Sequence, residues 1–231
     1  MKNYKHIFFD LDRTIWDFEQ NAREAYHDIY EKYNLRHLGI ASFEDFTQSY
    51  LKHNDRLWAL YREGKIEKEY LMWRRFEMTL LEFGIDDKKL AEKIGLDYIT
   101  ISPRKTILFP NAYETLKYLY DRYPLHIITN GFEEVQHIKL KNSKLDVYFD
   151  HVITSEAAGC KKPDPCIFNF ALKTVGTKPD ECVMIGDDPE VDIAGAHALG
   201  IDTVFFNPKH IACNGNVTHE IFDLAELKNI F

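Results

Sequence analysis

The chain has 231 residues, 45% of them hydrophobic and 29% charged, which is typical of a soluble globular protein with a substantial core. No apolar run approaches the roughly eighteen residues that a membrane-spanning helix needs. The apolar run near the N-terminus is too short for a signal peptide, so we expect a cytoplasmic protein. A formal net charge of −8 argues against binding of nucleic acid polymers, which relies on a basic face.

The first predicted element is a strand at residues 4–10, "YKHIFFD", which runs directly into the carboxylates Asp10 and Asp12. Side chains two apart on extended backbone point the same way, so the two anionic groups would lie side by side. Like charges this close cost free energy unless something cationic lies between them. The stretch therefore predicts a cationic partner at the end of the first strand.

Only helical patterning follows, from about residue 17 to about residue 103. Helices are predicted in the segments 21–35, 43–64, 66–84 and 86–99. Gly64 interrupts the first long pattern, and Gly84 followed by Asp86 and Asp87 indicates a helix end and a new N-cap. The segment is an inserted all-helical domain.

Strands and helices alternate in the rest of the chain. Apolar, β-branched runs predict strands at 125–130, 150–155, 182–187 and 202–207, and helical patterns lie at 111–123, 133–145, 165–176 and 189–200. Near-continuous hydrophobicity indicates strands that are covered on both faces. We therefore predict an α/β fold: a doubly wound, Rossmann-like parallel sheet core at 1–15 and 104–231, with a helical cap domain at 16–103.

Polar side chains follow three of these strands. Ligands of open α/β sheets bind beyond the carboxyl ends of the strands, and the cap is inserted at that end, where it could roof a site. The residues concerned are Asp10 and Asp12, Thr129 and Asn130, and Asp187 and Asp188.

Four separated pieces carry a resemblance to a known family: "DLDRT" at 10–14, "TNG" at 129–131, "KKPDP" at 161–165 and "GDDPEVD" at 186–192. In this order they resemble the haloacid dehalogenase (HAD) superfamily, with its motifs D-x-D-x-T, Thr or Ser, Lys, and G-D-x-x-x-x-D. Each piece alone says little, and the joint match carries the resemblance. The insert is similar to the cap of the C1-type phosphatases, and "DLDRTIWDFEQNAREA" looks most like the nucleoside monophosphate phosphatases among them.

The resemblance implies a Mg²⁺-dependent phosphomonoester hydrolase that forms an aspartyl-phosphate. Asp10 would be the nucleophile and Asp12 the general acid and base. An aspartate at position 12 favours phosphate chemistry, because dehalogenating relatives typically lack it. Thr14 would fix the turn of the motif through its hydroxyl. Arg13 stands where many members have Gly.

The remaining implied roles concern the phosphoryl group and the metal. Thr129, Asn130, Gly131 and Lys162 would bind the phosphoryl group, with Thr129 and Lys162 also counted as catalytic. The implied Mg²⁺ ligands are Asp10, the backbone carbonyl of Asp12, and Asp187, while Asp188 and Asp192 would hold the waters of the metal.

Simpler structural interpretations apply to several residues. Asp188 before Pro189 and Asp164 before Pro165 are typical helix N-caps. Lys139, Lys141 and Lys144 are expected to form a solvated helix face. The four cysteines, Cys160, Cys166, Cys182 and Cys213, show no metal spacing and are expected to be reduced thiols.

The substrate is less determined by the sequence. Aromatic residues in and near the cap could stack on a nucleobase, although helical spacing favours a core role: Trp16, Phe18, Tyr26, Tyr50, Trp58, Tyr61, Trp73 and Phe76. The resemblance implies a small phosphorylated metabolite, with a nucleoside 5'-monophosphate (5'-nucleotidase activity) favoured over a small sugar phosphate or phosphoglycolate. A non-catalytic binding or regulatory protein on the same scaffold is the alternative of another class. Both a monomer and a homodimer are compatible with the sequence.

Overall fold

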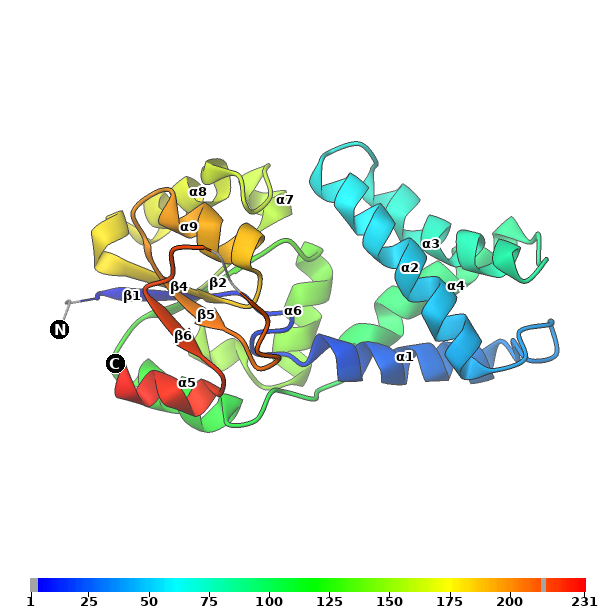
Figure 1. Cartoon of the computed structure of the whole chain (residues 1–231), viewed down its shortest axis with the longest axis horizontal. Helices are drawn as coiled ribbons and strands as arrows, with labels where there is room; N and C mark the ends of the chain where they lie inside the picture. The colour runs from blue at the N-terminus through cyan, green and yellow to red at the C-terminus, as the bar shows by residue number, and fades with distance from the viewer. Residues whose placement is uncertain (1–3, 213–214) are drawn as a thin grey trace. The chain divides into compact units, whose positions relative to one another are not determined.

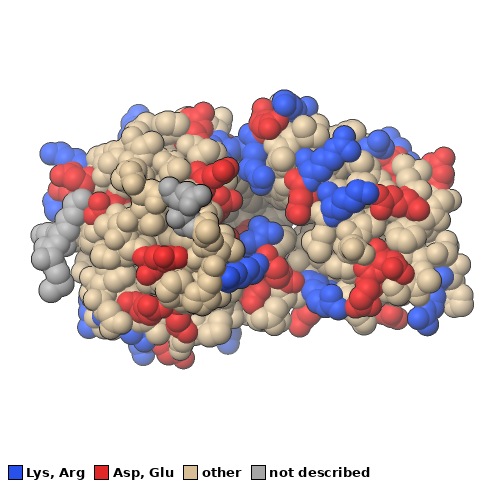
Figure 2. All heavy atoms as spheres, viewed as in Figure 1, with Lys and Arg blue, Asp and Glu red and all other residues tan. Residues whose placement is uncertain are grey.

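The computed structural model describes residues 4–212 and 215–231 and contains an α/β unit and a helical unit (Figure 1). The first unit comprises Met1–Phe18 and Thr106–Phe231, and the second comprises Glu19–Lys105. Among the described residues, no helix is long and apolar enough to cross a membrane. Acidic and basic side chains are scattered among the other residues on the visible surface (Figure 2).

The α/β unit is built on a six-stranded sheet in which every pair of neighbours is parallel. Its strands are β1 (His6–Phe9), β2 (Leu125–Thr129), β3 (His151–Thr154), β4 (Cys182–Gly186), β5 (Asp202–Phe206) and β6 (His219–Ile221). The order β3-β2-β1-β4-β5-β6 is that of a doubly wound Rossmann-like sheet. The predicted fold class is confirmed, while β6 was not predicted because a strand of only three residues carries no readable apolar run.

Both faces of the sheet are covered, which explains the continuous hydrophobicity of the strands. Alternate side chains point to opposite faces, so Ile7 and Phe9 belong to one core cluster and Phe8 belongs to another. The helices α5 (Ala112–Tyr120) and α6 (Glu133–Asn142) contribute to the first cluster. The second cluster contains side chains of α8 (Pro165–Val175) and α9 (Gly195–His197), on the other face (Figure 1).

Short elements complete the unit: α7 (Ser155–Ala158), η2 (Asp146–Tyr148), η3 (Pro179–Glu181), η4 (Pro189–Ala194) and η5 (Leu224–Asn229). The predicted helix at 189–200 begins as the π-helical segment η4 and continues as α9.

The helical unit contains α1 (Phe18–Lys32), α2 (Phe43–Arg62), α3 (Lys68–Glu82), α4 (Lys88–Ile101) and η1 (Ser102–Arg104). The predicted helix boundaries are present: Gly64 and Gly84 have φ of +69° and +75°, and the Asp87 side chain caps α4 by accepting from the amide of Leu90.

Half of the eight aromatic residues predicted in or near the cap are buried in the helical unit: Tyr26, Tyr50, Tyr61 and Phe76. Tyr26, Tyr50 and Phe76 are buried, and the Tyr50 ring lies 4.6 Å from that of Tyr26 and 4.8 Å from that of Phe76. These three rings are therefore not available to stack on a ligand. Trp16 and Phe18 belong to the α/β unit instead.

The prediction of reduced thiols is wrong for one pair of cysteines, because Cys160 and Cys166 form a disulfide. The turn between them brings their Cα atoms to 6.2 Å, within disulfide range, and the sequence spacing alone gave no sign of this. Cys182 is free and buried, and Cys213 lies outside the described residues.

Candidate active site

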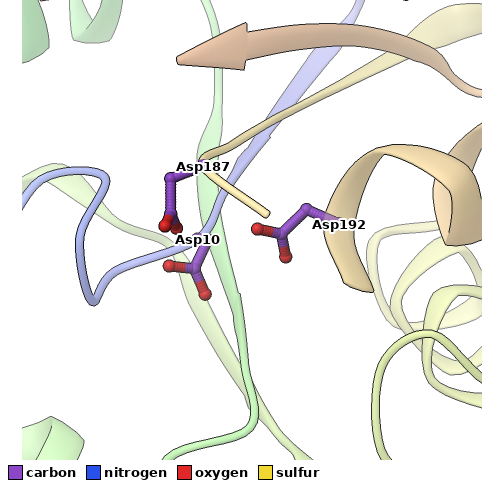
Figure 3. Close-up of side chains that lie close together, drawn as sticks. All are labelled: Asp10, Asp187 and Asp192. Carbon is purple, nitrogen blue, oxygen red and sulfur yellow. The ribbon is translucent and has the colours of Figure 1, made fainter. Parts of the chain in front are cut away.

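Three carboxylates meet at the carboxyl ends of the central strands. Asp10 follows β1, Asp187 follows β4, and Asp192 comes from η4; each has an oxygen within 4.8 Å of the others. Strands β1 and β4 pair with Phe9 opposite Ile185, so their ends coincide. Figure 3 shows the three side chains directed toward one another. Gly186 permits this arrangement, because a Cβ there would lie 2.4 Å from Asp192 Oδ2.

The carboxylate cluster is electrostatically unfavourable without a cation. Burial raises the pKa of Asp187 well above its ordinary value, and the charges of Asp10 and Asp192 raise it further. Burial likewise raises the pKa of Asp10, although the nearby Lys162 ammonium partly offsets this. Such a group of oxygen donors is suited to a hard divalent cation such as Mg²⁺.

Lys162 lies beneath this cluster and is 2% exposed. Its Nζ donates to Asp10 Oδ1, to Asp192 Oδ1 and to the carbonyl oxygen of Ile128, at 2.6, 2.6 and 2.7 Å. Burial alone would lower the pKa of this ammonium, but Asp10 and Asp192 outweigh burial and raise it above its ordinary value. Lys162 is therefore a fixed cation held against Asp10.

Asn130 connects the end of β2 to the loop that carries Lys162. Its Nδ2 donates to the carbonyl oxygen of Lys162 at 2.9 Å, and its Oδ1 accepts from the amide of Lys162 at 2.8 Å. The amide of Gly131 donates to Thr129 Oγ1 at 3.1 Å, which orients the hydroxyl of that threonine.

Thr14 and Arg13 lie in the turn that follows β1, within the segment "DLDRT" at 10–14. The Thr14 hydroxyl lies 3.4 Å from Asp10 Oδ2 and 3.3 Å from Asp187 Oδ1, so it contacts carboxylates where the sequence predicted a backbone contact. Arg13 has a φ of +69°, a left-handed conformation that glycine adopts easily, and its guanidinium stacks on Phe18.

The N-cap predictions for Asp188 and Asp164 are confirmed. Asp188 Oδ1 accepts from the amides of Glu190 and Val191, both at 2.9 Å, and Asp164 accepts from the amide of Cys166. The backbone amide of Asp188 also donates to Asp192 Oδ2 at 3.1 Å. The structure thus gives Asp188 a capping role at the start of η4.

Asp12 contacts two residues that sequence reasoning missed. Lys139 Nζ lies 2.5 Å from Asp12 Oδ1, and Gln136 Nε2 lies 2.8 Å from Asp12 Oδ2. The prediction of a solvated lysine face is wrong for Lys139, which is 4% exposed, whereas Lys141 and Lys144 are exposed.

A signal for Lys139 was present in the helical spacing. Phe132, Gln136, Lys139 and Leu140 are all buried and recur at the i, i+4, i+7 and i+8 positions of one helix face. A buried lysine on the apolar face of a helix needs a partner for its ammonium, and here the partner is the partly exposed Asp12.

Comparison with known proteins agrees with this geometry. A family model described as haloacid dehalogenase-like hydrolase matches residues 4–200. The chain is 32% identical to the pyrimidine 5'-nucleotidase YjjG of Escherichia coli, over 88% of this chain and 86% of that protein. It is also 32% identical to a glyceraldehyde 3-phosphate phosphatase of Methanothermobacter thermautotrophicus, over 98% of this chain and 99% of that protein.

Among solved structures, the chain is similar to the HAD-hydrolase YfnB of Bacillus subtilis, described as bound to magnesium. That likeness has a TM-score of 0.89 and 28% identity and covers 99% of each chain. With a family match over residues 4–200 and two relatives, each 32% identical, that cover 88% and 98% of it, the chain belongs to the haloacid dehalogenase-like hydrolases.

Proposed function

We propose that the protein is a Mg²⁺-dependent phosphomonoester hydrolase that acts through an aspartyl-phosphate on nucleoside 5'-monophosphates. The observation that carries the proposal is the position of Asp10. One of its oxygens is held by the buried Lys162, and its neighbours Asp187 and Asp192 complete an oxygen-rich site for a cation.

The residues support a two-step reaction. A carboxylate oxygen of Asp10 attacks phosphorus, the bond from phosphorus to the leaving oxygen breaks, and Asp12 gives that oxygen a proton. Asp12 then takes a proton from a water molecule, which opens the aspartyl-phosphate and releases inorganic phosphate. Thr129 and the backbone amide of Asn130 would donate to the phosphoryl oxygens, with the amide of Gly131 beside them. Lys162, whose three N–H groups already have acceptors, would balance the charge of Asp10 and of the phosphoryl group.

The metal ligands in this proposal are Asp10, the backbone carbonyl of Asp12, and Asp187, with Asp192 beside them. When bound, Mg²⁺ would neutralise the charge between the nucleophile and the phosphoryl group. The relative bound to magnesium and the raised pKa values of Asp10 and Asp187 support this choice.

The nucleotide preference rests on relatives named pyrimidine 5'-nucleotidase, including one from Streptococcus pneumoniae that is 29% identical over 97% of this chain. A small sugar phosphate is the second candidate, because a relative that is 32% identical to this chain is named glyceraldehyde 3-phosphate phosphatase.

The test is release of phosphate from nucleoside monophosphates, sugar phosphates and phosphoglycolate, with Mg²⁺ and with EDTA. We expect metal-dependent turnover, highest kcat/KM on a nucleotide, and loss of turnover in Asp10→Asn. A higher kcat/KM on sugar phosphates would replace the nucleoside 5'-monophosphate with a sugar phosphate as the proposed substrate. Full activity of Asp10→Asn would contradict the assignment of Asp10 as the nucleophile.

A further inference from the structure

We propose that Lys139 and Gln136 are positioning residues that hold the Asp12 carboxylate for proton transfer to the leaving group. The inference rests on the proposed function, because it needs Asp12 to act as the general acid. It assigns a task to two buried polar residues of α6 that the mechanism above does not use.

The two residues bind different oxygens of the same carboxylate. Lys139 Nζ lies 2.5 Å from Oδ1 and Gln136 Nε2 lies 2.8 Å from Oδ2, so rotation of the carboxylate about its last bond is restricted. A carboxylate offers about four acceptor positions. Those that remain can face a leaving oxygen or a water molecule.

Burial makes the pair of Lys139 and Asp12 asymmetric. The Lys139 side chain is 4% exposed, whereas the Asp12 side chain is 21% exposed. The lysine is therefore enclosed by the protein, and the carboxylate is the member that a small molecule can reach. This is the arrangement expected when Lys139 orients the Asp12 side chain and Asp12 exchanges the proton with the substrate.

Trp16 fixes Lys139 from another side. Lys139 Nζ lies 4.2 Å from the centroid of the Trp16 ring, which is fully buried. The carbonyl oxygen of Trp16 accepts from the amide of Arg13, closing the turn that follows Asp12. Lys139 thus contacts both the side chain of Asp12 and the end of its turn.

Gln136 also links the proposed acid to the proposed phosphate-binding residue. Its Nε2 lies 3.2 Å from Thr129 Oγ1 as well as 2.8 Å from Asp12 Oδ2. One amide group therefore sets the spacing between the proton donor and the hydroxyl that would hold the phosphoryl group. A small misplacement of this spacing would slow proton transfer strongly.

The chemistry of the first step gives Lys139 a further effect. As the bond from phosphorus to oxygen breaks, the proton of the Asp12 carboxyl moves to the leaving oxygen, and Asp12 becomes a carboxylate. The Lys139 ammonium lies against the charge that appears. Its contribution should matter most for leaving groups that need a proton.

The test compares two phosphate esters in Lys139→Met, which keeps an apolar stem against Trp16. An alkyl phosphate needs protonation as it leaves, whereas p-nitrophenolate leaves without it. General acid catalysis contributes about 10²- to 10⁴-fold, so we expect kcat/KM for the alkyl ester to fall by about 10²-fold and that for p-nitrophenyl phosphate by less than about 10-fold. Because kcat/KM reports only steps up to departure of the leaving group, the second step does not obscure the comparison.

Matched variants define the controls. Lys141→Met, on the exposed face of the same helix, should leave both values unchanged. Lys139→Arg should recover part of the loss. Gln136→Leu leaves the ion pair in place and should show the same selectivity for the alkyl ester. In Asp12→Asn, adding Lys139→Met should cause no further loss, because both changes remove the same step.

Equal losses on the two esters in Lys139→Met and Gln136→Leu would overturn the positioning role while leaving the phosphatase intact. A raised KM with unchanged kcat on both esters would also overturn it, since that pattern indicates direct binding of substrate. A wild-type protein that hydrolyses neither these two esters nor nucleoside monophosphates, sugar phosphates and phosphoglycolate with Mg²⁺ present would instead overturn the proposed function, and the positioning role with it.

Discussion

Gly131 illustrates how closely the site residues pack. A Cβ at this position would lie 1.5 Å from Gln136 Nε2, although the backbone itself would accept an alanine. The obstructing atom is the end of a flexible side chain, so the fold can adjust by moving it. The adjustment would separate Gln136 from Asp12 and Thr129.

We therefore expect Gly131→Ala to lower kcat/KM on alkyl phosphates by about 10-fold or more, a loss of at least about 1.4 kcal/mol in transition-state stabilisation. The midpoint of thermal unfolding should change little. Steady-state kinetics and a thermal melt on the same preparation check this. Normal activity with a displaced Gln136 would show that its contacts are dispensable.

Sequence patterns predicted the residues of the site better than their contacts. Asp10, Thr129, Lys162 and Asp187 could be placed together because motifs at neighbouring strand ends must converge in a parallel sheet. The contacts of Thr14 and Asn130 depend on loop conformations that the sequence does not encode locally. The charge of Lys139 favours a solvated position, but its place on the apolar face of α6 and its contact with Asp12 keep it buried.

At the scale of elements, long periodic segments were predictable and short ones were not. The four long helices of the helical unit and the first five strands follow from hydrophobic periodicity and from glycine and aspartate boundaries. β6 was missed because it is too short for a pattern, and η4 because a π-helical turn has the same composition as an α-helix.

Asp188 lies between β4 and η4 and has two proposed roles, as the N-cap of η4 and as a residue that holds waters of the metal. The two roles can be tested separately. Asp188→Ala removes the oxygen that caps two amides of η4, and we expect it to cost about 1 kcal/mol of stability, or about 2–4 °C in the thermal midpoint. Asp188→Ser keeps a capping oxygen but removes the charge, so it should restore the midpoint.

The Mg²⁺ concentration needed for half-maximal activity distinguishes the second role. If Asp188 holds waters of the metal, Asp188→Ser should need more Mg²⁺ while remaining as stable as wild type. An unchanged requirement for Mg²⁺ in both variants would leave Asp188 as a helix cap alone.

For the whole molecule, stability at low pH should depend on a histidine buried in the sheet. The rings of His6, His126 and His151 lie next to one another across β1, β2 and β3, with centroids 5.3 and 5.4 Å apart. Burial lowers the pKa of His126 from 6.5 to about 3, and the neighbouring His6 and His151 add to the effect. As pH falls below 6.5, His126 takes up a proton in the unfolded chain but stays neutral in the folded chain until the pH approaches about 3.

We therefore expect the contribution of His126 to lower the free energy of unfolding as pH falls from 6.5 toward 3, so that His126→Leu gains stability relative to wild type over this range. Urea unfolding at about pH 7 and about pH 5 measures the difference. His137→Gln, at an exposed position of α6, should leave the slope of stability against pH as in wild type. Equal slopes in wild type and His126→Leu would mean that other groups govern the acid response.

As a proposed Mg²⁺ ligand, Asp187 should couple binding of the metal to the stability of the whole molecule. Without a cation, its carboxylate is crowded by Asp10 and Asp192, which is why its pKa is raised. Asp187→Asn removes one of the like charges with little change in shape, so the metal-free midpoint of thermal unfolding should stay equal or rise. The same change removes an oxygen ligand of high charge, so stabilisation by Mg²⁺ should be largely lost.

For wild type, free Mg²⁺ at about 100 times its Kd should add about 2.7 kcal/mol of stability, because a ligand that binds only the folded state stabilises it by mass action. Thermal melts with Mg²⁺ and with EDTA measure both effects, and Asp180→Asn, at an exposed position of η3, controls for the loss of any one acidic charge. An equal Mg²⁺ shift in Asp187→Asn and wild type would place the cation elsewhere, because a metal held at these three carboxylates cannot lose one of them without cost.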